Sequence, residues 1–256
     1  MKHTPSVLAV SLALTASAAM ADSCSVRSPA HRVALIELYT SQGCSSCPPA
    51  DRWLSGLGQR VPDTQAIPLS MHVGYWDYIG WKDPFAKREF NERQRAWATA
   101  NGSRSVYTPG VFVQGRELRE WSSSAALGAS LRASQSMPAG ASLSLAGEFA
   151  AGRLNVDVQA SAVAGQHTAS PELRLALVQS GLQTAVRAGE NRGEQLANDH
   201  VVREWSAALP LGRHRTSFTL PAGARPQDWA VVALVQSEAG GEILQALRWS
   251  KASCKG

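Results

Sequence analysis

The chain has 256 residues, of which 44% are hydrophobic and 18% are charged. These proportions are ordinary for a globular protein and argue against a disordered chain or a coiled coil. The formal net charge of +5 comes from scattered basic residues rather than one dense block, so the sequence predicts no nucleic-acid-binding surface. The length is comfortable for two domains.

The first 21 residues have the pattern of a secretory signal peptide. Lys2 precedes an apolar run over 7–14, and small residues follow up to Ala21. A positive start, a short apolar stretch and an Ala-x-Ala site are typical of a cleaved export signal. The run is too short to span a bilayer as a permanent helix. We therefore expect a periplasmic or secreted protein that has no membrane span after cleavage; an uncleaved anchor is the alternative.

The next stretch combines a buried strand with a Cys-x-x-Cys motif. The apolar run over 32–39 predicts a strand buried on both faces. A helix is predicted from Cys47 to about residue 59, because the two prolines after Cys47 suit a first helical turn. Unpaired N–H groups at a helix start favour a thiolate. We expect Cys44 to be the more exposed sulfur and the nucleophile, and Cys47 to resolve a mixed disulfide. A structural, unreactive disulfide is the alternative.

Two further side chains are candidates for the same chemistry. Glu37 lies in an apolar run, where an ionised carboxylate is costly unless it is paired. It is either a strand residue that reaches solvent or an arginine, or a catalytic acid, a role that the resemblance given below implies. His72 ends a second predicted strand over 66–73, on the side of the cysteines. It could relay protons beside a substrate, bind a metal with the thiolates, or be structural.

The remaining predicted elements of this half follow in order. An aromatic loop over 74–85 is expected to be core, and a polar helix is expected over 85–100. A short strand begins after Pro109, because proline cannot donate to a ladder and belongs at a strand start. Residues 117–121 are expected to form a returning strand. A closing helix is expected over 122–134, with its first serine as N-cap.

This order of elements resembles the thioredoxin fold, with Cys-x-x-Cys at the first helix and Thr108-Pro109 before the third strand. The resemblance implies a cis Thr108–Pro109 bond in a loop that lies against the cysteines and contacts bound substrate, with Tyr107 and His72 nearby; a trans proline at a strand edge is the alternative. It also implies thiol–disulfide oxidoreductase activity without a cofactor. Because thioredoxins carry an acid on this strand beneath the cysteines, it implies that Glu37 is a catalytic proton acceptor for Cys47, with a raised pKa. The partners would be protein thiols or disulfides of the cell envelope.

A closer resemblance rests on four motifs, over residues 37–51, 72–77, 81–84 and 105–109. In these motifs the chain is similar to a bacterial family of exported thioredoxin-like proteins known as domain of unknown function 1223. The likeness covers most of the mature chain. The family's title names no activity, so the resemblance implies the fold and leaves the substrate, the direction of redox chemistry and the oligomeric state open.

From about residue 137 the sequence changes to short alternating runs separated by Gly-, Pro- and Asn-rich turns. About seven strands in roughly a hundred residues are typical of an antiparallel β-sandwich. We therefore predict an α/β plus all-β protein. It would have a signal peptide over 1–21, a thioredoxin-like domain over 22–136 and a β-sandwich over 137–256.

Four cysteines allow three pairings, and an exported chain meets an oxidising compartment that favours disulfides. Cys44 and Cys47 are near enough to pair locally. Cys24 and Cys254 are then predicted to form a bridge that closes almost the whole mature chain, although one or both could be free in a frayed tail.

Three functions are consistent with these features. The first is a thiol–disulfide oxidoreductase. The second is a copper or zinc carrier that uses Cys44, Cys47 and His72, because soft thiolates with an imidazole suit these metals. The third is a non-enzymatic envelope binding protein in which the motif is a structural disulfide. No resident metal or cofactor is predicted.

Overall fold

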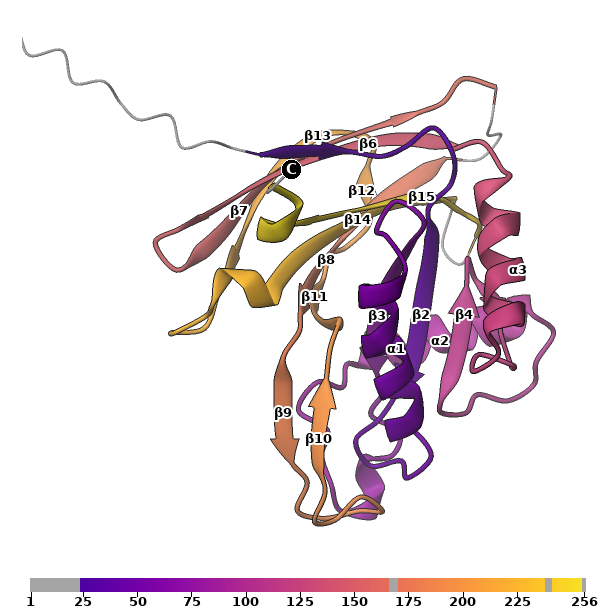
Figure 1. The fold of residues 1–256 in the computed structure, drawn as a ribbon, viewed down its shortest axis with the longest axis vertical. Coiled ribbons are helices and arrows are strands. Elements are labelled where there is room, and N and C mark those ends of the chain that lie inside the picture. Colours follow the sequence, from indigo (N-terminus) through magenta and orange to yellow (C-terminus); the bar gives the residue numbers. More distant parts are fainter. Residues whose placement is uncertain (1–23, 166–169, 238–240, 255–256) are drawn as a thin grey trace, which may run out of the picture.

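The computed structural model describes residues 24–165, 170–237 and 241–254, with the backbone alone at 254. The predicted signal peptide therefore lies outside the described residues. Within them, strands dominate and three α-helices cover part of a large sheet (Figure 1). No helix in these ranges has the length and hydrophobicity needed to cross a membrane.

The elements of the first half alternate between strands and helices. They are β1 (Ser25–Arg27), β2 (Ala34–Thr40), α1 (Pro48–Arg60), β3 (Ala66–His72), the 3₁₀-helix η1 (Asp77–Ile79), α2 (Arg88–Ala100), β4 (Gly110–Val113), β5 (Arg116–Glu117) and α3 (Ser124–Gln135).

The second half consists mainly of strands. They are β6 (Ala141–Ala150), β7 (Arg153–Ala162), β8 (Pro171–Gln179), β9 (Leu182–Ala185), β10 (Gln195–Asn198), β11 (Val201–Trp205), β12 (Leu209–Pro210), β13 (Gly212–Thr219), β14 (Trp229–Ser237) and β15 (Ile243–Ser250), with the 3₁₀-helices η2 (Pro226–Asp228) and η3 (Lys251–Cys254).

One mixed sheet runs through both halves of the chain. Its order is β15-β14-β8-β11-β3-β2-β4-β5, and β12 pairs with β8. Strands β2 and β3 are parallel, whereas β4 is antiparallel to β2 and β5 is antiparallel to β4. Strand β11 joins β3 in parallel through the pair Val201 and Ser70. Strands from both sides of the predicted boundary at residue 136 therefore share one sheet.

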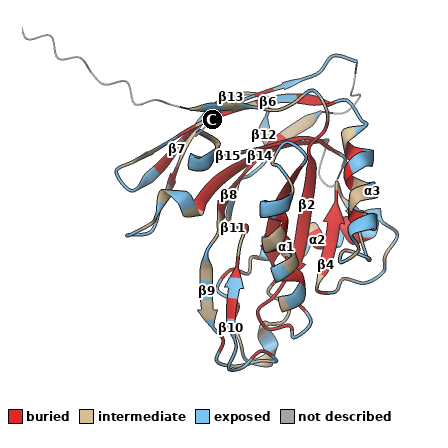
Figure 2. Cartoon of the chain, in the orientation of Figure 1, coloured by how far each residue is buried: buried red, intermediate tan, exposed pale blue. Residues whose placement is uncertain are grey.

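The central strand β2 is buried on both faces (Figure 2). Successive side chains of a strand point to opposite faces. Ile36 and Leu38 therefore pack with the buried residues of α1 and α3, while Leu35 and Tyr39 pack with Phe90 and the rest of the α2 side. This double burial explains why the sequence here is a nearly continuous apolar run.

A second sheet, of order β1-β6-β7-β13, faces the β8, β14 and β15 part of the large sheet. Its strands alternate between buried and exposed residues, as expected of a sheet with one solvent face. The indole of Trp249 packs directly on Gly147, where an added Cβ would lie 2.6 Å from the ring. A bulkier residue at this position would separate the two sheets.

Several helix boundaries differ from the predicted ones. Helix α2 begins at Arg88 rather than near residue 85, because the Asp83 carboxylate accepts the backbone N–H of Phe85 and holds a turn there. Ser123, not Ser122, is the N-cap of α3, and its hydroxyl accepts the N–H of Ala126 at 3.3 Å. The returning antiparallel strand predicted over 117–121 is present as β5, but it has only two residues and ends at Glu117.

Candidate functional site

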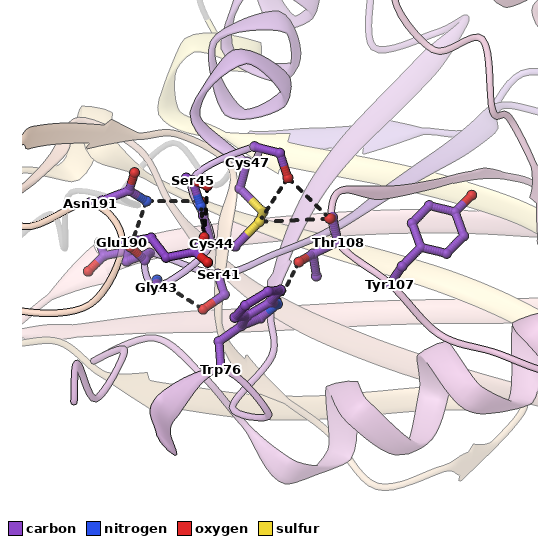
Figure 3. The surroundings of a disulfide bond; sticks show 12 residues. Ser41, Gly43, Cys44, Ser45, Cys47, Trp76, Tyr107, Thr108, Glu190 and Asn191 are labelled. Carbon is purple, nitrogen blue, oxygen red and sulfur yellow. Dashed lines mark hydrogen bonds between the residues drawn. A yellow bond between two sulfur atoms is a disulfide. The ribbon is translucent and has the colours of Figure 1, made fainter. Parts of the chain in front are cut away.

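Cys44 and Cys47 form a disulfide with a Cα–Cα distance of 5.5 Å (Figure 3). The pair follows the carboxyl end of β2, and Cys47 is the N-cap residue of α1. The carbonyl oxygen of Cys47 accepts the N–H groups of Ala50 and Asp51 at 2.9 and 3.1 Å. The motif therefore lies at the start of the first long helix, as the sequence predicts.

Both cysteines are buried in the oxidised protein, so the predicted difference in exposure in favour of Cys44 is negligible. Cys44 is 1% exposed and Cys47 is fully buried, whereas Ser45 and Ser46 between them are exposed. The Sγ atom of Cys44 lies 3.3 Å from the hydroxyl of Ser46 and 3.7 Å from the carbonyl oxygen of Thr108. These neighbours cover the sulfur, so a reaction partner cannot reach it without a local movement.

Thr108 and Pro109 border the disulfide, and the bond between them is cis, as the thioredoxin resemblance implies. The indole N–H of Trp76 donates to the Thr108 hydroxyl at 2.7 Å, which holds this loop against the cysteines. Tyr107 turns away from the sulfurs (Figure 3), and its phenol donates to Glu117. Burial and this hydrogen bond raise the pKa of Tyr107 to about 12. Of the predicted substrate-contacting residues, the structure brings Thr108 and Pro109 to the disulfide and not Tyr107.

Glu37 lies on the opposite face of the sheet from α1, among the residues that pack against α2. Its carboxylate accepts three hydrogen bonds from Arg93, at 2.6, 3.0 and 3.3 Å, one from the Trp97 indole at 2.6 Å and one from the Tyr39 hydroxyl at 2.8 Å. The predicted catalytic role beside Cys47 is therefore not supported. Glu37 is instead the strand residue that reaches an arginine. Successive side chains of a strand point to opposite faces, so Leu38 points toward the face of the cysteines and Glu37 points away from it.

Glu37, Arg93, Trp97 and Tyr39 form a cluster, called the Glu37 cluster below, in which the two opposite charges pair with each other. The Arg93 guanidinium lies 5.1 and 5.0 Å from the ring centres of Trp97 and Trp205. Burial opposes its charge, but the Glu37 carboxylate outweighs this cost and raises the pKa of Arg93. Burial and the same carboxylate raise the pKa of the Tyr39 phenol.

His72 lies on the α1 face of β3, where it pairs with a second carboxylate. Its Nδ1 atom is 2.7 Å from Asp83, and both side chains are fully buried. Asp83 also accepts the backbone N–H groups of Gln42 and Phe85, at 2.8 and 2.9 Å. Burial opposes both charges, but each partner outweighs it, so the pKa of His72 is raised and that of Asp83 is lowered. Each group therefore favours the charged form of the other.

Asp51 is a buried acid that the sequence interpretation missed. It lies on α1 one turn after Cys47, on the same side of the helix. Burial raises its pKa to about 6, although the nearby His72 opposes this shift. The spacing of four residues from Cys47 is the signal that could have identified it. An acidic residue in a first helical turn is usually explained by the helix dipole alone.

A layer of polar atoms without partners separates the sheet from the first turn of α1. Within the described part of the chain, four buried side-chain atoms on this face have no hydrogen-bond partner: Thr40 Oγ1, Asp51 Oδ1, Ser70 Oγ and His72 Nε2. Buried polar atoms normally have partners, so a group of exceptions needs an explanation. Two of the four residues, Asp51 and His72, are titratable.

A loop from the second half of the chain also contacts the motif. The backbone N–H and the hydroxyl of Ser45 donate to one carboxylate oxygen of Glu190, at 2.9 and 2.7 Å. The Asn191 side chain donates to the carbonyl oxygens of Gln42 and Cys44, both at 2.9 Å. The Ser45 hydrogen bonds lower the pKa of Glu190. The sequence alone favours a structural role for this polar loop and gives no signal of the contact, which joins residues 145 positions apart.

The described residues do not support the metal site considered as an alternative, and they do not test the second predicted disulfide. The described residues contain no group of three or more His, Cys, Asp or Glu side chains placed to hold a metal ion. His72 directs Nδ1 to Asp83 rather than to the sulfurs. The side chain of Cys254 lies outside the described residues, so its bridge to Cys24 stays a prediction.

Fold and site together define a mixed α/β protein with a Cys-x-x-Cys disulfide at a helix start. The chain belongs to the family described as "Protein of unknown function (DUF1223)", which matches residues 35–236. This membership confirms the second resemblance inferred from the sequence motifs.

Two solved structures share the fold. Protein AGR_C_4864 from Agrobacterium tumefaciens matches with a TM-score of 0.62 and 24% identity, covering 86% of this chain and 95% of that one. HBP35 of Porphyromonas gingivalis matches with a TM-score of 0.63 and 15% identity, covering 87% and 76%. At these identities the likeness concerns the fold alone. No curated protein is significantly similar to this chain.

Proposed function

We propose that this protein is an exported thiol–disulfide oxidoreductase in which Cys44 and Cys47 alternate between a disulfide and a dithiol. The observation that carries the proposal is the disulfide at the start of α1, lying against the Thr108–Pro109 loop. The strand order β3-β2-β4-β5, with α1 and α3 on one face and α2 on the other, supports a thioredoxin-like domain. The facing sheets of the second half support a β-sandwich that shares the large sheet.

The chemistry would transfer two electrons between a partner's thiols and the disulfide. A partner thiolate attacks Sγ of Cys44, the Cys44–Cys47 bond breaks, and Cys47 leaves as a thiolate that takes up a proton. The partner's second thiolate then attacks the partner sulfur of the mixed disulfide. This step releases the partner's disulfide and leaves Cys44 as the thiolate. The reverse sequence reduces a partner disulfide and reoxidises the pair.

Asp51 and His72 are the groups we assign to the proton of Cys47. A thiolate at a fully buried position is costly, because burial favours the neutral form. Asp51 lies one helical turn away with its pKa raised to about 6 by burial, so it can give up or accept a proton near neutral pH. Its neighbour His72 has an unpartnered Nε2 atom on the same face of the sheet. This arrangement gives Asp51 the proton-accepting role that the sequence suggested for Glu37.

A second candidate function follows from the burial of both sulfurs. With Cys44 1% exposed and Cys47 0% exposed, the disulfide could be a permanent brace in a non-enzymatic envelope protein. The compartment itself rests on the signal-like first 21 residues.

A redox titration against glutathione separates the two candidates. Under native conditions we expect the Cys44–Cys47 pair to exchange with the buffer at one defined potential, followed by alkylation and mass spectrometry. A Cys47→Ser variant should accumulate a mixed disulfide on Cys44, and a Cys44→Ser variant should not accumulate one on Cys47. If the pair becomes reduced only in denaturant, the oxidoreductase proposal is wrong and the structural disulfide is correct.

A further inference from the structure

The β9–β10 hairpin projects beyond the end of the large sheet and lies beside α1 (Figure 1). Its two strands pair with each other and, among the described strands, with no others. An isolated two-stranded hairpin is marginally stable. The position of this hairpin must therefore depend on side-chain contacts with the rest of the protein.

Those contacts converge on the Cys-x-x-Cys turn. At the tip, residues 186–194 form the loop whose Glu190 and Asn191 bind the backbone of residues 42–45. Along the strands, the Gln42 side chain donates to Thr184 and Asn198, both at 3.0 Å. The hairpin is thus attached partly through the segment that carries Cys44, and its tip also packs on Trp81, whose Cβ would lie 3.2 Å from a Cβ added to Gly189.

The two ends of the hairpin are fixed to the rest of the protein. Gly181 precedes β9 with φ +73°, and His200 follows β10 with φ +57°. The N–H of Gly181 donates to the Asp199 side chain at 2.8 Å, and the carbonyl oxygen of the buried His200 accepts the Ser70 N–H at 2.8 Å. Opening would therefore involve the loop at the tip of the hairpin rather than its base.

We propose that residues 186–194 form a lid over the Cys44–Cys47 site, which Glu190 and Asn191 hold closed and which an incoming polypeptide must displace. The proposal rests on the oxidoreductase function proposed above, whose regulation it describes. Figure 3 shows Glu190 and Asn191 on one side of the disulfide and Thr108 on the other, with the reactive sulfur between them.

The closed lid and the reduced Cys44 would each place a negative charge at the same backbone N–H group, that of Ser45. A hydrogen bond from a backbone N–H stabilises a thiolate, and the Ser45 N–H, which directly follows Cys44, is the donor in question because residues 48 and 49 of α1 are prolines without an N–H. In the closed lid the Ser45 N–H is already occupied by the Glu190 carboxylate. A Cys44 thiolate and the Glu190 carboxylate would repel each other, so reduction favours the open lid. By linkage, opening the lid favours reduction to the same extent.

The lid is tested by the rate at which a small neutral reductant reaches the disulfide in the folded full-length chain. Tris(3-hydroxypropyl)phosphine attacks one sulfur, and water converts the adduct to the phosphine oxide and two thiols. Because the reagent carries no charge, removal of a carboxylate cannot change its attraction to the site. Glu190→Ala combined with Asn191→Ala should raise the reduction rate about tenfold, because the hydrogen bonds of both side chains to residues 42–45 are lost.

Two single-residue variants refine the test. Glu190→Gln keeps an oxygen that can accept from Ser45, so its rate should lie between those of the wild type and the double variant. Glu194→Gln removes the charge of an exposed glutamate in the same loop, and its rate should equal the wild-type rate. Circular dichroism of each variant confirms that the chain is folded.

The outcomes separate the lid from the oxidoreductase. If the wild-type pair equilibrates with glutathione but the double variant is reduced at the wild-type rate, the lid is wrong and the oxidoreductase stands. If the double variant is reduced about tenfold faster but neither protein equilibrates with glutathione, the lid covers a structural disulfide and the oxidoreductase falls. Faster amide hydrogen exchange of residues 186–194 in the reduced wild type supports coupled opening, and unchanged exchange contradicts it.

Discussion

Two buried carboxylates lie on opposite faces of the same sheet, and their surroundings differ sharply. Glu37 accepts hydrogen bonds from Arg93, Trp97 and Tyr39 on the α2 face. Asp51 lies on the α1 face, where its Oδ1 atom has no partner. A buried charge is tolerated when it is paired and hydrogen-bonded, and otherwise the group tends to become neutral. The first acid thus has partners for its carboxylate, whereas burial raises the pKa of the second to about 6.

This difference separates a carboxylate with a structural role from one that is suited to proton transfer. The Glu37 carboxylate already accepts hydrogen bonds from three side chains, so it is suited to holding α2 against the sheet. Asp51 has a pKa raised to about 6 by burial and lies one turn from a cysteine. Perturbed pKa values gather at functional sites, because chemistry near neutral pH needs groups that titrate there. Position relative to the disulfide then makes Asp51 the candidate.

Breaking the satisfied cluster should have the largest effect. Arg93→Met keeps much of the side-chain length but leaves the Glu37 carboxylate buried without its ion-pair partner. We expect a loss of about 3–5 kcal/mol in the free energy of unfolding at pH 7, measured by urea denaturation. Arg95→Met on the exposed face of the same helix should change it by less than about 0.5 kcal/mol. A loss of under about 1 kcal/mol at Arg93 would mean that the cluster is not a stabilising unit.

The buried Asp51 on the α1 face should make the free energy of unfolding depend on pH. The pKa of Asp51 is about 6 in the folded protein, above its ordinary value of 3.8. Between those values the folded state binds more protons than the unfolded state, so this group's contribution to stability falls as pH rises. Asp51→Asn removes the effect. Its unfolding free energy relative to wild type should therefore rise by about 3 kcal/mol between pH 4 and pH 8.

His200 titrates in an overlapping pH range, with the opposite effect on stability, but it does not disturb this comparison. Burial, with the nearby Arg248, lowers the pKa of His200 to about 4. A histidine shifted downward makes stability rise with pH from about 4 to about 6.5, opposite in sign to Asp51. Both proteins contain His200, so its contribution cancels in the difference. A difference that stays flat across this range would show that Asp51 keeps its ordinary pKa and would remove it from the proposed proton pathway.

Local features of the sequence were enough to predict the part of the site that depends on neighbours along the chain. The prolines after Cys47 placed the start of α1 within one residue, and the apolar run over 32–39 predicted the doubly buried strand. These two features are set by backbone geometry and strand period, both of which are local. The placement of the Thr108–Pro109 loop against the cysteines was implied by the thioredoxin resemblance instead, and the contact with Cys44 bears it out.

The remainder depends on which face a side chain occupies and on distant pairings. Glu37 looked like the buried acid of the site because it precedes the cysteines, but one position along a strand reverses the face. Glu190 reaches Ser45 only because β9 and β10 fold back beside α1, and no local pattern encodes that approach. The continuity of the large sheet through β11 is a tertiary pairing of the same kind.

The smallest expected effect compares two adjacent residues of β2 that point to opposite faces. Tyr39→Phe removes a hydroxyl that donates to Glu37 at 2.8 Å, and it should cost about 1.5 kcal/mol because the acceptor is charged. Thr40→Val replaces a buried hydroxyl that has no partner by a methyl group of similar size. Burying such a hydroxyl is unfavourable, so the valine variant should be neutral or more stable by up to about 1 kcal/mol.

Urea denaturation of both variants at pH 7, with the disulfide intact, measures this pair. Opposite or clearly unequal changes would show that hydrogen-bond satisfaction differs between the faces of one strand. An equal loss at Thr40 would mean that its hydroxyl is bonded on the α1 face. The polar layer beneath the cysteines would then be as fully paired as the Glu37 cluster, and the comparison would no longer single out Asp51 and His72.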